Sequence, residues 1–232
     1  MHLFIAEGKK IVDELLQSHI DVVHLYTSGN YFGNKPFTKI DGDEMKKIST
    51  LTTPQNILAM CRIPAENSVI PDFSKELVLV LDDIRDPGNM GTIIRIADWF
   101  GINYIFCTSE CVDAYNPKTV QASMGSIARV KVDYKNLRGV MQQCRDNHIP
   151  VYGAKLDGAN ILQTQLTSHG VIVIGNESNG ISEELGAYIT HSLKIPAYPV
   201  SGKAVSAESL NAAIATAILC AEFRREELKG KS

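Results

Sequence analysis

The chain has 232 residues and a hydrophobic content of 44%, so it can bury a substantial core as one large domain or two smaller ones. Its formal net charge of -3 does not by itself favour a nucleic-acid partner, because proteins that bind phosphates usually carry a basic excess. The first twenty residues interrupt short apolar groups with charged side chains, so we expect a cytoplasmic protein without a signal peptide or a membrane span.

The cysteine and histidine residues give no sign of a disulfide framework or a metal site. There are five cysteines, an odd number, and no two of them form a C-x-x-C pair. None of the six histidines belongs to an H-E-x-x-H motif. We therefore expect no metal.

The first part of the chain alternates short helical and strand patterns. Apolar residues at helical spacing predict a helix at residues 9–18, and the apolar run at 22–26 predicts a strand. A turn-rich stretch at 28–37 precedes a second short helix near 44–48 and a strand at 57–61. This order predicts a small α/β domain.

The composition changes after that domain. Residues 65–75 carry polar residues and a proline without a sustained period, which is typical of a linker, so we place a first domain at 1–64 and a second at 76–232. The second domain contains apolar runs of the kind found in strands that are covered on both faces. We predict a parallel α/β sheet with helices on both faces, built on strands at 77–81, 104–107, 151–154 and 171–174.

The last predicted helix, at about 209–227, is apolar nearly all round in its first half. A helix that is apolar on every side must be buried on every side. One face can cover the sheet, and the other then needs a partner. A dimer interface is therefore expected.

The first of three segments that could carry catalytic or binding residues follows the strand at 77–81. The sequence Asp86-Pro87-Gly88 predicts a turn, and Asn89 can cap the next helix. Gly91 lies one helical turn before Arg95, so we expect its missing side chain to leave space beneath the guanidinium. The alternative is a capped helix with a solvated arginine.

A second segment follows the strand at 171–174. Gly175 and Gly180 bracket Asn176 and Glu177, and two glycines around a carboxylate allow a ligand to approach the backbone closely. The chain contains no G-x-G-x-x-G motif, which argues against a dinucleotide site. The alternative interpretation is that Gly175 and Asn176 simply begin a loop after the strand and bind no ligand.

A third segment spans residues 193–211 and leads into the last helix. The Gly-Lys pair at 202–203 invites a phosphate-loop interpretation, but Ala204 replaces the Ser or Thr that would hold magnesium. Ser209 and Asn211 present polar groups toward the sheet edge, or they cap the helix.

Taken in order, these segments resemble the SpoU (TrmH-like) branch of the SPOUT RNA methyltransferases. The resemblance covers about 75–228 and includes the intervening residues 116–125. Residues 4–8 and 54–58 resemble parts of the small L30e-like RNA-binding domain that many members carry. The residues that carry the main resemblance are Asn89, Gly91 and Arg95; Gly175, Asn176, Glu177 and Gly180; and Ile195, Pro196, Ser209, Leu210 and Asn211.

The resemblance implies a parallel α/β sheet with a C-terminal trefoil knot, a topology that general rules of chain connection would reject. It also implies S-adenosylmethionine as the cofactor and a homodimer as the assembly. The residues that match the family's cofactor-binding positions are Gly175, Ile195, Ser209 and Leu210.

For the chemistry, the resemblance implies a central role for Arg95, assisted by Asn89, Glu177 and Asn211. The reaction is methylation of a ribose 2'-hydroxyl, which is a poor nucleophile and must be aligned and helped to lose its proton. Because arginine stays protonated, the hypothesis is that Arg95 binds the target phosphate and orients or activates the hydroxyl.

The expected substrate is RNA, with ribosomal RNA favoured over transfer RNA because of the N-terminal domain. The basic residues expected to contact it are Lys9, Lys10, Arg85 and Lys118. A non-catalytic RNA-binding relative is the main alternative. A nucleotide-dependent oxidoreductase on a similar sheet lacks its glycine motif.

Overall fold

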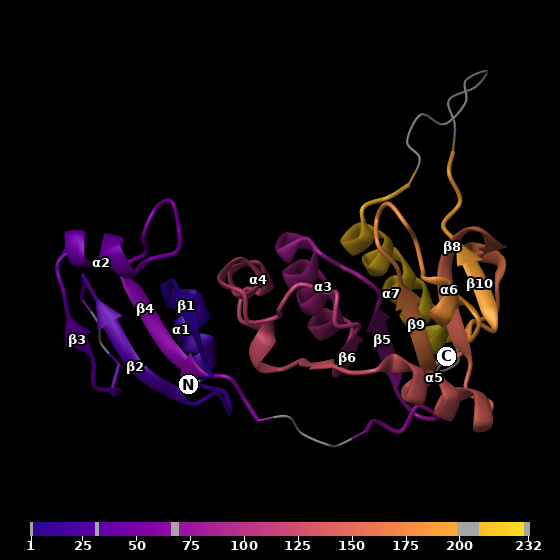
Figure 1. The fold of residues 1–232 in the computed structure, drawn as a ribbon, viewed down its shortest axis with the longest axis horizontal. Helices are drawn as coiled ribbons and strands as arrows, with labels where there is room; N and C mark the ends of the chain where they lie inside the picture. The colour runs from indigo at the N-terminus through magenta and orange to yellow at the C-terminus, as the bar shows by residue number, and fades with distance from the viewer. Residues whose placement is uncertain (1, 31–32, 66–69, 199–208, 230–232) are drawn as a thin grey trace.

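The computed structural model describes residues 2–30, 33–65, 70–198 and 209–229. These residues form two β-sheets, which we use to define an N-terminal part and a C-terminal part (Figure 1). In the described ranges, no helix has the length and apolar character needed to cross a bilayer.

The N-terminal part is a four-stranded mixed sheet with two helices. Its strand order is β1-β4-β2-β3, with antiparallel pairing except between β2 and β3. The two predicted helices and two predicted strands are confirmed, whereas the short strands β1 and β3 were not predicted. The elements are β1 (Leu3–Glu7), α1 (Lys9–Leu16), β2 (Val22–Thr27), β3 (Thr38–Lys39), α2 (Gly42–Ile48) and β4 (Ile57–Arg62).

The C-terminal part is a six-stranded sheet in which every pairing is parallel, so the predicted parallel α/β sheet is confirmed. The strand order is β10-β8-β9-β5-β6-β7. β7 was not predicted because it is a partly exposed edge strand without an apolar run. The strands are β5 (Leu77–Leu81), β6 (Tyr104–Cys107), β7 (Lys131–Tyr134), β8 (Val151–Asn160), β9 (Gly170–Ile174) and β10 (His191–Lys194).

Helices cover both faces of this sheet, as predicted. Alternate residues of β5 point to opposite faces: Leu79 packs in the same cluster as α3 and α7, whereas Val80 packs with α5 and α6. The helical elements are α3 (Pro87–Trp99), α4 (Pro117–Ser123), η1 (Ser126–Ala128), α5 (Leu137–Asp146), η2 (Ile161–Gln163), α6 (Glu183–Gly186) and α7 (Ala212–Lys229).

The strand order reverses next to β5. From β5 the chain builds outward through β6 and β7, and it then returns to place β9 on the other side of β5. Ligands of open parallel sheets bind at such a reversal, outside the carboxyl ends of the strands. The C-terminal trefoil knot stays a prediction from the family resemblance.

Helix α7 begins at Ala212, three residues later than predicted, and it is not buried on every side. Residues such as Leu219 and Phe223 are buried in the core that also contains α3, whereas Ile214 is 54% exposed. The helix therefore covers the sheet with one face and leaves part of its apolar surface uncovered in the single chain.

Gly91 has a different role from the one expected. A Cβ atom at this position would lie 2.5 Å from the backbone oxygen of Thr119 and 2.6 Å from Cβ of Ala122. The space left by the missing side chain is therefore filled by helix α4, and the interpretation that it makes room for Arg95 is wrong. Gly91 allows α3 and α4 to pack backbone against backbone.

This packing predicts that Gly91→Ala destabilises the protein by about 1–3 kcal/mol, because the added methyl group overpacks the α3–α4 contact. The measurement is urea-induced unfolding. Gly139→Ala is the matched control, since Gly139 also lies inside a helix but a Cβ atom there meets nothing within 4 Å. The control should gain up to about 1 kcal/mol from helix propensity, and equal effects of the two substitutions would contradict the packing argument.

Candidate active site

A cavity of about 420 Å³ opens beside β9 in the C-terminal part. Its wall comes from β8, the loop that follows β9, the end of β10 and the beginning of α7. The volume lies within the range of small-molecule sites. All four residues expected to bind the cofactor, Gly175, Ile195, Ser209 and Leu210, line this cavity.

The loop after β9 is held in a tight turn. Asn176 and Gly180 exchange two backbone hydrogen bonds of 3.0 and 2.9 Å, and Gly180 has a left-handed φ of +69°. A Cβ atom on Gly175 would lie 2.3 Å from the backbone carbon of Gly180. Only glycine fits at 175, so the backbone itself forms this side of the cavity.

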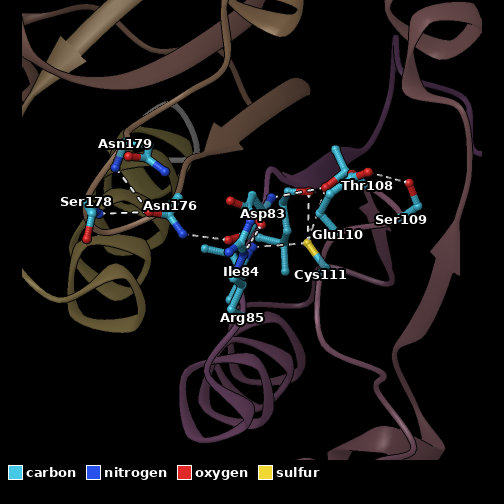
Figure 2. A network of polar contacts seen from close by, with 11 residues as sticks. Asp83, Ile84, Arg85, Thr108, Ser109, Glu110, Cys111, Asn176, Ser178 and Asn179 are labelled. Atoms are coloured by element: carbon cyan, nitrogen blue, oxygen red, sulfur yellow. Dashed lines mark hydrogen bonds and ion pairs between the residues drawn. The ribbon is translucent and has the colours of Figure 1, made fainter.

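The same turn is tied to the end of β5 (Figure 2). The side-chain amide of Asn176 donates to the backbone oxygen of Asp83 at 2.9 Å, and its oxygen accepts from the backbone N–H groups of Ser178 and Asn179. Asp83 has a left-handed φ of +59°, which is strained for a residue other than glycine. A hydrogen bond from its N–H to Thr108 Oγ1 stabilises that conformation.

Cys111 lies beneath this strained residue. Its sulfur accepts a hydrogen bond from the N–H of Ile84 at 3.2 Å. Hydrogen bonding with Cys107, and then with Thr108 and the backbone, outweighs burial and lowers the pKa of Cys111 to about 7. All five cysteines are free and buried. No group of three or more possible metal-ligating His, Cys, Asp or Glu side chains occurs among the described residues.

Three of the predicted catalytic residues meet beside the cavity, and one of them, Glu177, lines its wall. The amide of Asn89 donates to Glu177 Oε1 at 2.5 Å, and the amide of Asn211 donates to Asn89 Oδ1 at 2.8 Å. These side chains come from α3, from the loop after β9 and from the residue before α7. The three segments that are distant in sequence therefore converge.

The helix caps explain how these side chains are oriented. The cap of α3 is Asp86, whose carboxylate accepts from the N–H of Asn89 at 2.8 Å. The expectation that Asn89 caps this helix is wrong, and its side chain instead bonds to Glu177. Asn211 both caps α7, by accepting from the N–H groups of Ala213 and Ile214, and donates to Asn89.

Arg95 stands apart from this network. It is exposed on α3, and its side chain makes no hydrogen bond or ion pair with the described residues. It does not belong to the wall of the cavity. The structure thus brings together three of the four predicted catalytic side chains and leaves the fourth exposed to solvent on the helix that carries Asn89.

The basic residues expected to contact RNA are all exposed, but two are paired within the chain. Lys9 forms an ion pair with Asp13, and Arg85 forms one with Asp83 at 2.6 Å. Lys10 and Lys118 are exposed. The Gly-Lys pair at 202–203 and Ala204 lie outside the described residues.

Sequence reasoning missed part of the cavity wall. Lys155, Leu156 and Asp157 of β8 line it, because β8 extends six residues beyond the predicted strand. The extension contains Gly158, where a Cβ atom would lie 2.6 Å from the backbone of Leu193 in β10. A glycine inside an otherwise extended segment was the signal of this close approach.

Comparison with known proteins agrees with this geometry. The model of the SpoU rRNA methylase family matches residues 76–221. The chain belongs to the SpoU family. It is 29% identical to the 23S rRNA (guanosine(2553)-2'-O)-methyltransferase RlmP of Bacillus subtilis, over 95% of this chain and 88% of that protein.

Two solved structures extend the SpoU likeness to nearly the whole chain. One, from Porphyromonas gingivalis, is assigned to the TrmH family of RNA methyltransferases and is 39% identical, with a TM-score of 0.82 over 97% of this chain and 90% of that chain. The other is an AdoMet-bound rRNA methyltransferase from Sinorhizobium meliloti, 28% identical, with a TM-score of 0.82 over 97% and 87%.

The two roles of Asn211 can be separated by substitution. We expect Asn211→Ala to lower the free energy of unfolding by about 1 kcal/mol, because the cap of α7 is lost. Asn211→Asp should retain most of the stability, since aspartate also caps helices, but its carboxylate cannot donate to Asn89. Chemical denaturation of both variants measures this difference, and an alanine variant as stable as the wild type would argue against the cap.

Proposed function

We propose that the chain transfers a methyl group from S-adenosylmethionine to a ribose 2'-hydroxyl of RNA, with ribosomal RNA preferred over transfer RNA. The observation that carries this proposal is the hydrogen-bonded chain from Asn211 through Asn89 to Glu177 beside the cavity. Membership of the SpoU family and the names of the relatives support the reaction class.

The cavity fits the cofactor in size and in the chemistry of its wall. Apolar side chains such as Ile195 and Leu210 suit an adenine ring, and the bare backbone at Gly175 offers hydrogen bonds without steric hindrance. We assign Gly175, Ile195, Ser209 and Leu210 to cofactor binding. When bound, S-adenosylmethionine supplies an electrophilic methyl group on a sulfonium sulfur.

Residues of the chain itself align the nucleophile, which is the ribose 2'-hydroxyl. Asn211 holds the amide of Asn89, and Asn89 in turn holds one carboxylate oxygen of Glu177, so the three side chains act as one oriented group. Arg95 is exposed on the same helix as Asn89, where its guanidinium binds the phosphate next to the target ribose. Fixing the phosphate aligns the hydroxyl for transfer.

We also propose that the N-terminal part, as an L30e-like domain at 1–64 joined by a linker at 65–75 to a methyltransferase domain at 76–232, binds the RNA. A groove of about 960 Å³ lies between α1 and the loops after β2 and before β4. Amide side chains can both donate to and accept from base edges in unpaired RNA. The polar residues of the groove include Lys9, Gln17, Asn30, Lys35, Gln55 and Asn56.

The active assembly that we propose is a homodimer in the cytoplasm. Ile214, Ala217, Ile218 and Ala221 recur at helical spacing on the side of α7 that the sheet does not fully cover. Such an apolar stripe needs a covering surface, and a second copy of the same helix provides one.

The proposed reaction is tested with radiolabelled S-adenosylmethionine and an unmodified transcript of Bacillus subtilis 23S rRNA. Arg95→Ala should lower methyl transfer by at least about 100-fold, because the hydroxyl is no longer aligned. Calorimetry should show unchanged cofactor binding, and Arg145→Ala is the control for loss of an exposed arginine. A wild-type chain that binds RNA but no cofactor would be a non-catalytic relative, which contradicts the proposed reaction. Substantial methylation by Arg95→Ala would contradict the role proposed for Arg95.

The proposed dimer is tested by sedimentation velocity. Ile214→Asp should convert the protein to monomers, since it places a charge in the apolar stripe of α7. Ile48→Asp is the matched control, because Ile48 is an exposed isoleucine at the end of α2 in the N-terminal part. A wild-type chain that sediments as a monomer would refute the dimer.

A further inference from the structure

The N-terminal and C-terminal parts are packed against each other as well as joined by the chain. β1 lies beside α4 (Figure 1). The rings of Phe4 and Tyr115 have centroids 4.9 Å apart. One apolar cluster continues through the contact, from Phe4 and Ile11 on one side to Val120 and Ile127 on the other. The two sheets therefore share a core and are not held by the linker alone.

Arg129 adds a polar bridge to this contact. Its guanidinium donates to Glu14 of α1 at 2.6 Å and to both carboxylate oxygens of Asp98 of α3, at distances from 2.8 to 3.0 Å. Asp98 also accepts from the buried hydroxyl of Ser126 at 2.7 Å. We call Glu14, Asp98, Ser126 and Arg129 the Arg129 bridge.

Asp98 and Arg129 stabilise each other in their charged forms. Burial acts to raise the pKa of Asp98, but hydrogen bonds from Arg129 and Ser126 outweigh it, and the pKa is lowered. The hydrogen bond to Asp98 raises the pKa of Arg129 further above its usual range. Asp98 and Arg129 are therefore ionised at neutral pH.

Gly125 makes the contact sterically specific. Its φ of +95° lies in the left-handed region, and a Cβ atom there would lie 2.9 Å from Cβ of Glu14. The backbone before η1 thus presses directly against the side chain that Arg129 holds. Shape and charge fix the same residue of α1 from two directions.

The two helices joined by the bridge carry different functions under the proposed reaction. α1 lines the RNA groove through Lys9 and Asp13, whereas α3 carries Asn89 and Arg95. We infer that Arg129 is a positioning residue that sets the orientation of the RNA groove relative to the methyl-transfer site. The inference rests on the proposed function. It means that the enzyme selects RNAs whose recognised element and target ribose have a fixed spatial relation.

An exposed ion pair often contributes little, and Arg129 is 46% exposed. The ion pair of Arg129 with Glu14 differs in its geometry from an ordinary exposed pair. The same guanidinium makes a bidentate contact with Asp98 of the C-terminal part and a further hydrogen bond to Glu14 of the N-terminal part. A bidentate contact fixes direction as well as distance. The Arg129 bridge therefore controls the orientation of the N-terminal part relative to the C-terminal part more than it controls the stability of the fold.

The orientation is measured first, without catalysis. Spin labels on Lys47→Cys in α2 and Gln143→Cys in α5 report the distance between the two parts, and the five native cysteines are buried. We expect Arg129→Ala to broaden the distance distribution and Arg129→Lys to broaden it less. Arg145→Ala is the matched control, since its guanidinium donates to the backbone oxygen of Ala187 and stacks on Tyr188, both within the C-terminal part.

The consequence for RNA is measured next. For an unmodified Bacillus subtilis 23S rRNA transcript, Arg129→Ala should raise both the Kd and the KM about tenfold, because the two surfaces no longer engage one RNA in a fixed geometry. The Kd for S-adenosylmethionine and the kcat at saturating RNA should not change. A short hairpin around position 2553, which reaches only the methyl-transfer site, should be bound equally by the variant and the wild type.

The outcomes separate the two proposals. An unchanged distance distribution, an unchanged Kd for the long transcript, or an equal loss in Arg145→Ala overturns the positioning role of Arg129. A wild-type chain that methylates no RNA defeats the proposed function, while the distance and RNA-binding measurements still decide whether the bridge orients the groove. A loss of kcat or of cofactor binding would show a general structural defect and would also overturn the inference.

Discussion

The pairing of β5 with β9 is the constraint on which the candidate site depends. The two strands run parallel, with Leu81 opposite Ile174, and every residue of both is buried. Because parallel strands end at the same edge of the sheet, the loops that follow them begin side by side. One loop leads to Asn89 and the other contains Glu177, so a contact between residues 88 positions apart follows from the register of two apolar strands. A slip of one residue would exchange the two faces and separate the loops.

Side chains of the site both cap helices and orient the proposed catalytic residues. Asp86 caps α3, which leaves the amide of Asn89 to hold Glu177. Asn211 uses its oxygen to cap α7 and its amide to hold Asn89. An amide has both a donor and an acceptor, so it can serve two partners at once, whereas an ionised carboxylate only accepts and would leave one of them unsatisfied. The positions of the helices and of the proposed catalytic group are therefore set by the same hydrogen bonds.

Much of the fold could be read from sequence because buried parallel strands leave continuous apolar runs, as at residues 77–81. Edge strands such as β7 leave no such run, and β3 is too short to show a pattern. The residues of the site could be named from the resemblance to a family, but the residues with which each of them forms hydrogen bonds or packs could not. The packing of Gly91 on α4 depends on the path of a helix that comes later in the chain, and local spacing contains no information on it.

The net charge of -3 and the proposed RNA substrate are reconciled by how the polar groups are distributed. Lys9 and Arg85 are each paired with an aspartate, so few cations are left for phosphates at the expected RNA-contact positions. A protein with few phosphate contacts releases few counterions, and its affinity for RNA depends less on charge and more on shape and base contacts. Shape can discriminate only if the contacting surfaces keep a fixed relation. The shared core and the Arg129 bridge supply that rigidity, so that under the proposed function a weakly charged chain can select its RNA by structure.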